Sequence, residues 1–349
     1  MSNEIAIDAR GVWKVFGDRA SEALEAIHKE GLGKSEVLTR FGCVVGVADA
    51  SFEIEEGELF CIMGLSGSGK STLVRHVNRL LEPTAGQILI DGRDVMGLND
   101  AQLRDLRNHK VAMVFQNFGL MPHRTVRDNV AMPLEIRNAS KARRWAEADR
   151  VLELVELTGW EDKYAHELSG GMQQRVGLAR AIAADPDILL MDEPFSALDP
   201  LIRKQLQDQF MALSSELKKT TMFITHDLDE AIRIGKRIAI MKDGRIVQIG
   251  TPEEIILNPV DDYVSDFVAG ISKLNMIFAH SVMTPVDKFK ADNGELPHDA
   301  KEAAPDMDLS DLMDLCMDGS GIVKVMADNQ TVGVINRSGL IRAIKENQG

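Results

Sequence analysis

Strand-like and helix-like patterns alternate along most of this chain. Residues 4–16 alternate apolar and polar side chains and are rich in residues that favour strands. Further strand-like runs lie at 44–56, 58–64, 87–95, 111–116, 188–193, 221–227 and 237–250. Helical spacing fills the stretches between them, most clearly over 125–184. Strands that alternate with helices predict an α/β protein with a largely parallel sheet.

Two regions interrupt this alternation. Apolar residues from 20 to 27 fall at helical spacing before a glycine-containing stretch, which predicts a short helix and a loop over 18–40. Beyond about residue 270 the chain is rich in charge and proline, so we expect a main domain over 1–270 and a linker over 271–308. A small piece over 309–349 is expected to form a helix, a hairpin with Asp328 and Asn329 in its turn, and a last helix.

Composition narrows the function classes. The length of 349 residues suggests two domains, or one large domain with an appendage, at roughly 150 residues per domain. The net charge of −14 would repel a phosphate backbone, and aromatic residues are only 5% of the chain, so we expect no nucleic acid partner. Cys43, Cys61 and Cys316 lie far apart in the sequence, which indicates a reducing compartment.

Membrane targeting is not evident in the sequence. The first ten residues lack the charged and then apolar run of a signal peptide. No apolar stretch approaches the roughly 20 residues that span a bilayer. We therefore expect a cytosolic chain, unless another protein holds it at a membrane.

A glycine loop carries the first chemical signal. Residues 64–71 read GLSGSGKS, which matches GxxxxGK[ST] and lies between a predicted strand and a predicted helix. Its backbone N–H groups can surround a phosphate, while Lys70 reaches the β- and γ-phosphates and the Ser71 hydroxyl holds Mg²⁺. The candidate nucleotide-binding residues are Gly64, Ser66, Gly67, Ser68, Gly69, Lys70, Ser71 and Thr72. The alternative is a glycine-rich turn with no ligand.

Two acidic residues follow a short apolar strand at 188–191. A carboxylate at the end of a buried strand lies at the edge where α/β sheets bind ligands. Asp192 suits a Mg²⁺ site, and Glu193 suits polarisation of an attacking water. The alternative is an ordinary strand end with two solvated acids.

The segment 168–175, LSGGMQQR, narrows the class of nucleotide triphosphatase. It resembles the LSGGQ signature of the ATP-binding cassette (ABC) ATPases, with Met172 in place of the glutamine. Ser169 can cap a helix whose N-terminus faces phosphate, together with Gly170 and Gly171. A helix cap without a ligand would explain the serine, but not two successive glycines.

Further residues match the cassette pattern in order. Gln116 resembles the Q-loop glutamine, which contacts Mg²⁺ or water and the membrane partner, and Asp199 ends a D-loop at 196–199. His226 resembles the switch histidine at the γ-phosphate, and Phe16 the aromatic that stacks on adenine. Taken alone, His226 would be read as a structural histidine and Phe16 as a core aromatic.

The resemblance implies a fold and an assembly. It covers about residues 4–270 and implies a P-loop ATPase with a RecA-like core, a helical subdomain and an antiparallel β subdomain. It also implies ATP and Mg²⁺, a head-to-tail dimer with ATP between Lys70 of one copy and Ser169 of the other, and catalysis by Glu193. A membrane permease would contact 117–130, which places the chain on the cytoplasmic face of the inner membrane.

An insertion at about 17–45 indicates the subfamily. With the segments at 78–92, 118–135 and 244–255, it resembles the ATPase subunits of quaternary-amine importers, which serve a separate substrate-binding protein. Choline, glycine betaine and proline betaine are the candidate substrates. Residues 309–349 resemble one half of a CBS pair, either a sensor of ionic strength or nucleotide or an inert dimerisation tail. An importer of another small solute, such as an amino acid, and a soluble ATPase without transport function remain as alternatives.

Overall fold

The computed structural model describes residues 4–116, 119–196, 198–269, 278–294, 296–297, 300–317, 320–327 and 330–347. The chain divides into two compact units, Met1–Thr251 and Pro252–Gly349. Among the described residues, no helix is both long enough and apolar enough to cross a bilayer.

A six-stranded sheet forms the centre of the first unit. Its strands, in spatial order, are β10 (Arg245–Gly250), β9 (Arg237–Lys242), β3 (Leu59–Met63), β8 (Thr220–Thr225), β7 (Ile188–Asp192) and β6 (Val111–Val114). All neighbours are parallel except β10 and β9. Every residue of β7 and β8 is buried, as expected for strands covered on both faces. The parallel strands end at one edge, where they lead into the glycine loop, the acidic pair, Gln116 and His226.

A second sheet is antiparallel. It contains, in order, β2 (Val44–Glu55), β1 (Ile5–Phe16), β4 (Ala85–Ile90) and β5 (Arg93–Asp94). Helix α3 (Lys70–Val77) contacts strands of both sheets, and one apolar cluster joins its Leu73, Val74 and Val77 to them. The predicted α/β fold with a largely parallel sheet is therefore confirmed, with the antiparallel subdomain beside it.

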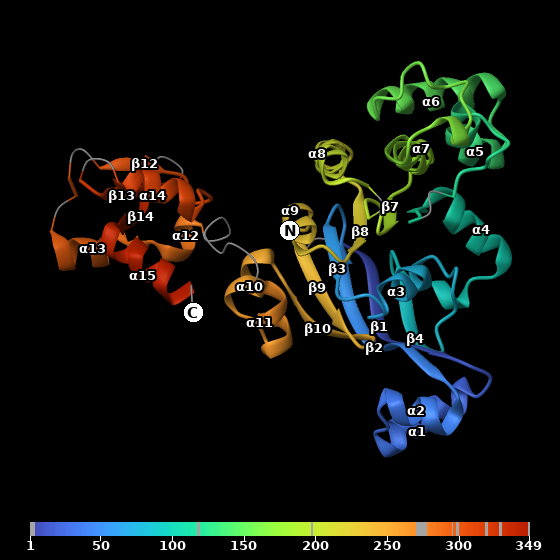
Figure 1. The fold of residues 1–349 in the computed structure, drawn as a ribbon, viewed down its shortest axis with the longest axis horizontal. Coiled ribbons are helices and arrows are strands. Elements are labelled where there is room, and N and C mark those ends of the chain that lie inside the picture. Colours follow the sequence, from blue (N-terminus) through green and yellow to red (C-terminus); the bar gives the residue numbers. More distant parts are fainter. Residues whose placement is uncertain are drawn as a thin grey trace. The chain divides into compact units, whose positions relative to one another are not determined.

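The other helices of this unit surround the sheets (Figure 1). They are α1 (Ala20–Glu30), α2 (Lys34–Phe41), α4 (Asp100–His109), α5 (Val126–Ile136), α6 (Lys141–Leu154), α7 (Gly170–Ala183), α8 (Pro200–Leu217) and α9 (Leu228–Ile234), with 3₁₀ turns at Val95–Gly97 and Ala165–Glu167. Helices α5, α6 and α7 pack on one another as a helical group (Figure 1). This group matches the helical subdomain that the sequence implied.

The insertion contains two helices instead of one helix and a loop. Gly31 ends α1 in the left-handed region, with φ of 71°, and Gly33 is already the N-cap of α2. Helix α2 buries only Val37, so apolar residues at helical spacing are too few in its sequence to predict it. Both helices pack on the antiparallel sheet through a cluster that includes Trp13, Ile27 and Val37.

The second unit is a small α/β body. It contains α10 (Pro252–Leu257), α11 (Asp262–Val268), α12 (Ala279–Val282), α13 (Val286–Asn293), α14 (Leu309–Met317) and α15 (Arg337–Asn347). Its sheet has the order β11 (Thr284–Pro285), β14 (Gln330–Asn336), β13 (Ile322–Ala327) and β12 (Lys301–Ala303). The helix, hairpin and helix expected after residue 309 are present, while their predicted turn residues Asp328 and Asn329 lie outside the described residues.

The linker expected over 271–308 is the main difference from the sequence analysis. Residues 270–277 lie outside the description, but the range after them carries α12, β11, α13 and β12. Pro285 is the N-cap of α13, and the Pro305 carbonyl oxygen accepts a hydrogen bond from the His280 amide. These prolines therefore belong to ordered structure. Ala279 and Ala303 belong to the core of this unit. The two compact units meet at Thr251, whereas the sequence placed the end of the main domain at about residue 270.

Candidate nucleotide-binding and catalytic site

The glycine loop connects the end of β3 to the first residue of α3. Gly64 and Gly69 have φ of 152° and 102°, which other residues rarely adopt. A Cβ on Gly64 would lie 2.2 Å from the Met241 carbonyl oxygen, and one on Gly69 would lie 2.2 Å from that of Gly46. The loop can therefore take this path only with glycine at both positions. Ser66 and Gly67 are exposed, and Ser71 and Thr72 are half-buried in the first turn of α3.

Lys70 points back into this loop. Its ammonium donates to the carbonyl oxygens of Gly64, at 2.8 Å, and Leu65, at 3.1 Å, and only 4% of the residue is exposed. Burial lowers the pKa of Lys70, and the nearby carboxylates of Glu193 and Asp192 oppose that shift. The loop thus holds a buried cation among its own carbonyl groups, where an anionic phosphate would find a charged donor.

Asp192 is the last residue of β7 and is fully buried. Its Oδ2 accepts a hydrogen bond from Arg75 of α3 at 3.0 Å. Its Oδ1 is buried and has no hydrogen-bond partner among the described residues. A buried carboxylate oxygen without a partner is costly unless a ligand satisfies it. Carboxylate and hydroxyl oxygens are the hard donors that Mg²⁺ prefers, so the chemistry of Asp192 and Ser71 fits the metal.

Glu193 lies at the centre of the acidic edge. It has φ of 47°, a sparsely populated backbone conformation that functional sites retain. Its Oε2 is 3.1 Å from His226 Nδ1 and accepts a long, 3.4 Å hydrogen bond from Gln116 Nε2. Its Oε1 is 4.0 Å from Lys70 Nζ. The structure therefore brings Lys70, Gln116, Glu193 and His226 together, from four separate segments.

Phe16 ends β1 beside the glycine loop. The residue is 39% exposed, and Lys14 Nζ lies 5.1 Å from its ring centroid. A Cβ on Gly46 would lie 2.6 Å from Phe16 Cε2, so the ring rests on the backbone of β2. The Gly46 carbonyl oxygen also lies against Gly69 of the loop, where an added Cβ would be 2.2 Å away. An exposed ring at this position can stack on a flat base.

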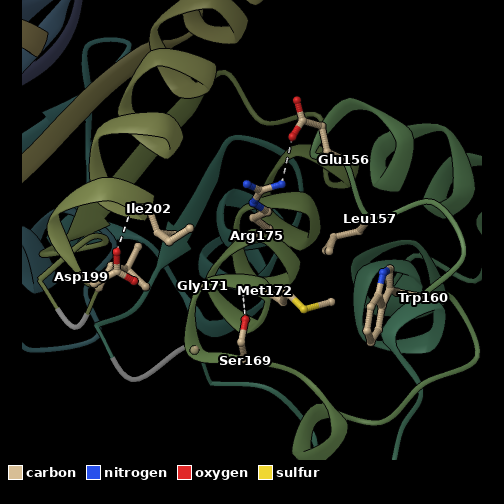
Figure 2. Close-up of a pocket in the computed structure, with 11 residues that line it drawn as sticks. Glu156, Leu157, Trp160, Ser169, Gly171, Met172, Arg175, Asp199 and Ile202 are labelled. Carbon is tan, nitrogen blue, oxygen red and sulfur yellow. Dashed lines mark hydrogen bonds and ion pairs between the residues drawn. The ribbon is translucent and has the colours of Figure 1, made fainter.

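The signature residues line a separate cavity of about 600 Å³. Figure 2 shows Ser169, Gly171, Asp199 and Ile202 on one side of it and Trp160 on the other. The Ser169 hydroxyl caps α7 by accepting from the Met172 amide at 3.3 Å, and Asp199 caps α8 by accepting from the Ile202 amide at 3.1 Å. Gly170 also lines this cavity, whereas Ala197 of the predicted D-loop lies outside the described residues.

The cavity and the glycine loop are distinct surfaces of one chain. In the described part of the chain, no hydrogen bond or ion pair joins Ser169 to the loop residues. Figure 2 also shows Arg175 in its ion pair with Glu156, at 3.1 Å, on the cavity wall. None of the residues that line the signature cavity belongs to the glycine loop at 64–71.

Comparisons with known proteins identify the family. A family model described as "ABC transporter" matches residues 47–196. The glycine betaine/proline betaine transport system ATP-binding protein ProV of Salmonella typhimurium is 47% identical over 347 residues, which is 99% of this chain and 84% of that protein. The chain belongs to the ABC transporter family, as an ATP-binding subunit.

Two further similarities agree with this assignment. The glycine betaine transport ATP-binding protein OpuAA of Bacillus subtilis is 52% identical over 290 residues, covering 83% of this ABC subunit and 69% of that protein. A dimeric ATP-binding cassette, solved in a post-hydrolysis state with ADP and Pi, is 32% identical with a TM-score of 0.60 and covers 70% of this chain and 98% of that one. The ABC resemblance seen in the motifs is thus confirmed, and the chain is an ATPase.

One residue that contacts this site, Arg75, was not predicted from the sequence. Arg75 pairs with Asp192 across 117 residues of sequence, and an arginine on a helix after a glycine loop would be read as a solvated side chain. Only the packing of α3 against β7 brings the two together. The other side chains at the catalytic edge were all expected from the motifs.

Proposed function

We propose that this ABC ATPase drives the import of a quaternary amine through a separate membrane permease, and that two copies enclose ATP between them. The convergence of Gln116 and His226 on Glu193, next to Lys70, is the observation that carries the catalytic part. The names of the similar proteins support the substrate class, because they describe transport of glycine betaine and proline betaine.

Each catalytic residue has a role that its surroundings support. Lys70 leaves the loop carbonyls to bind the β- and γ-phosphates of ATP. Glu193 accepts the proton of the attacking water, which Gln116 helps to orient, and His226 donates to the γ-phosphate. Ser71, Asp192 and Gln116 would hold Mg²⁺, which neutralises phosphate charge when bound. Phe16 and Thr72 complete the nucleotide contacts.

The separation of the two surfaces supports the two-copy arrangement. The glycine loop of one copy supplies Lys70, and the signature cavity of the other supplies Ser169, Gly170, Gly171 and Asp199. The capped N-terminus of α7 carries partial positive charge toward this cavity, which favours a phosphate there. Neither surface alone stabilises the full negative charge of the ATP phosphates. ATP therefore joins the two copies, and its hydrolysis releases them.

An apolar groove gives the permease a place to bind. It has a volume of about 360 Å³ and is lined by Leu80, Met113, Phe115, Met121, Met132, Pro133, Ile136 and Ala181, among others. Gly119, shortly after Gln116, also lines it and accepts a hydrogen bond from Arg180 of α7. Asn117 and Phe118, at the start of the predicted contact segment 117–130, lie outside the described residues. We assign this groove to a short helix of the permease, which would hold the chain on the cytoplasmic face of the membrane.

A charge placed in the groove tests that assignment. Ile136 is 54% exposed, and its replacement by glutamate should reduce co-purification with the permease by at least about tenfold, because a buried carboxylate would lie in an apolar interface. ATP hydrolysis by the isolated chain should not change. Leu154→Glu is the matched control, since Leu154 is 40% exposed on α6 outside the groove. Equal co-purification of both variants with the permease would exclude the groove.

Uptake measurements test the substrate class. Cells that lack this chain should lose uptake of radiolabelled glycine betaine, choline or proline betaine, measured at low and at high osmolarity. Restoring the wild-type chain should restore that uptake, and restoring Glu193→Gln should not. Unchanged uptake of all three amines would remove the substrate proposal and leave the ATPase assignment in place.

A further inference from the structure

The first turn of α8 forms one wall of the signature cavity. Asp199 and Ile202 line the cavity from this turn (Figure 2). A Cβ added to Gly171 would lie only 2.9 Å from Ile202 Cγ2, so the start of α7 packs directly on Ile202. A ligand that displaces the signature residues therefore also displaces the start of α8.

Arg203 follows Ile202 and is not among the residues that line the cavity. Its Nη2 donates to the Leu198 carbonyl oxygen at 3.1 Å, and its Nη1 donates to Asp227 Oδ2 at 3.3 Å. Its Nε is buried and has no hydrogen-bond partner among the described residues. One guanidinium thus connects the loop before α8 to the loop before α9.

Asp227 carries that connection to the catalytic edge. Its second oxygen, Oδ1, accepts from the Glu230 amide at 3.1 Å and caps α9, so the carboxylate is fixed at both oxygens. Asp227 directly follows His226, whose Nδ1 lies 3.1 Å from Glu193 Oε2. A continuous series of contacts therefore runs from the signature residues through Arg203 to the catalytic glutamate.

The packing of α8 on α9 does not depend on Arg203 alone. Gln207 donates to the buried Glu230 carboxylate at 2.8 Å, and Arg233 forms an ion pair with Asp208. These contacts lie further along the two helices and hold them together. The particular contribution of Arg203 is therefore to fix the two loops relative to each other.

We propose that Arg203 is a positioning residue that couples the signature cavity of a subunit to His226 and Glu193 of the same subunit. The inference rests on the proposed two-copy arrangement, in which the cavity receives the nucleotide bound to the partner. Nucleotide at one site then moves the loop at Leu198, and Arg203 passes that movement through Asp227 to the switch histidine of the other site. The two ATP sites are coupled in both directions by this route.

Steady-state hydrolysis by the full chain, measured against ATP concentration, tests the coupling. The wild-type chain should show a Hill coefficient approaching about 2, the limit for two sites. Arg203→Ala should lower it toward about 1 and reduce kcat by about tenfold, as expected for the loss of a contact in a coupling network. The affinity of the single chain for the fluorescent nucleotide TNP-ATP should stay unchanged, which a general loss of structure would not allow.

A double-mutant cycle distinguishes this route from a local effect. Asp227→Asn keeps the helix cap but loses the charge that Arg203 contacts, so it should reproduce the Arg203→Ala phenotype. The double variant should be no worse than either single variant, and Arg203→Lys should restore part of the cooperativity. Arg233→Ala removes another arginine between α8 and α9 and should leave the Hill coefficient unchanged.

The outcomes separate this inference from the proposed function. A cooperative wild type with an unchanged Arg203→Ala variant would overturn the role of Arg203 alone, and so would additive effects of the two single variants. Loss of cooperativity in Arg233→Ala would overturn it too, since general loosening of the helix pair would then explain the result. A wild type that hydrolyses ATP without cooperativity would overturn the coupling, and a Glu193→Gln chain without an ATP-dependent dimer would overturn the two-copy arrangement and this inference with it.

Discussion

Replacing Glu193 by glutamine should reduce ATP turnover by about a thousandfold, the size expected for loss of a general base. Glutamine has the same shape but cannot take up the proton of the attacking water. Lys70 and the glycine loop are untouched, so ATP should still bind with wild-type affinity. The variant should accumulate as an ATP-bound dimer, which size-exclusion chromatography with and without ATP will detect.

The control for this variant is Glu82→Gln. Glu82 pairs with Arg79 at a largely exposed position outside the site, so its substitution should change neither turnover nor association. Normal turnover by Glu193→Gln would contradict the assignment of the base. Slow turnover without an ATP-dependent dimer would instead contradict the two-copy arrangement while keeping Glu193 as the base.

The parts of the fold that the sequence predicted are those encoded by neighbouring residues. The strand before the glycine loop and the helix after it were expected from residues 58–81, and both are present as β3 and α3. Parallel strands place their carboxyl ends at one edge, so the motifs after β3, β7 and β8 had to lie close together. Helix α2 was predicted as a loop, because it buries a single apolar residue and its helical pattern is therefore weak.

The second unit shows where composition misleads. Charge and proline over 271–308 are typical of a linker. The structure instead places Ala279 and Ala303 in a core with residues such as Leu312 and Val325. The short elements between residues 279 and 303 contribute few apolar side chains each to this core, too few to produce a visible period.

Contacts between distant segments were also beyond the sequence. Asp192 is a candidate because it ends a buried strand, and His226 because it resembles the switch histidine of the cassette pattern. The motifs do not identify Arg75 or Arg203, whose partners lie 117 and 24 residues away and depend on how α3 and α8 pack. Arg75 contacts the proposed metal ligand Asp192 and Arg203 contacts Asp227 beside His226, and a single sequence carries no signature for such contacts.

Replacing Lys70 by alanine should weaken ATP binding by at least about a hundredfold, since charge-assisted hydrogen bonds to phosphate are among the strongest in proteins. The loss is larger here because Glu193 and Asp192 lie near the ammonium. Without the Lys70 ammonium, less positive charge would offset the repulsion between these two carboxylates and the triphosphate. Titration with TNP-ATP, with and without competing ATP, measures the change, and thermal unfolding checks that the variant folds.

A half-buried lysine outside the site provides the control. Lys34 also has its pKa lowered by burial, but it lies at the start of α2, outside the nucleotide site. Lys34→Ala should bind TNP-ATP as the wild type does, so any loss confined to Lys70→Ala reflects the phosphate contact and not the general removal of a partly desolvated lysine charge. Undiminished binding by a folded Lys70→Ala variant would remove the glycine loop as the nucleotide site. Together with Glu193→Gln, which should bind ATP but not hydrolyse it, the variant separates the binding of ATP from its chemistry.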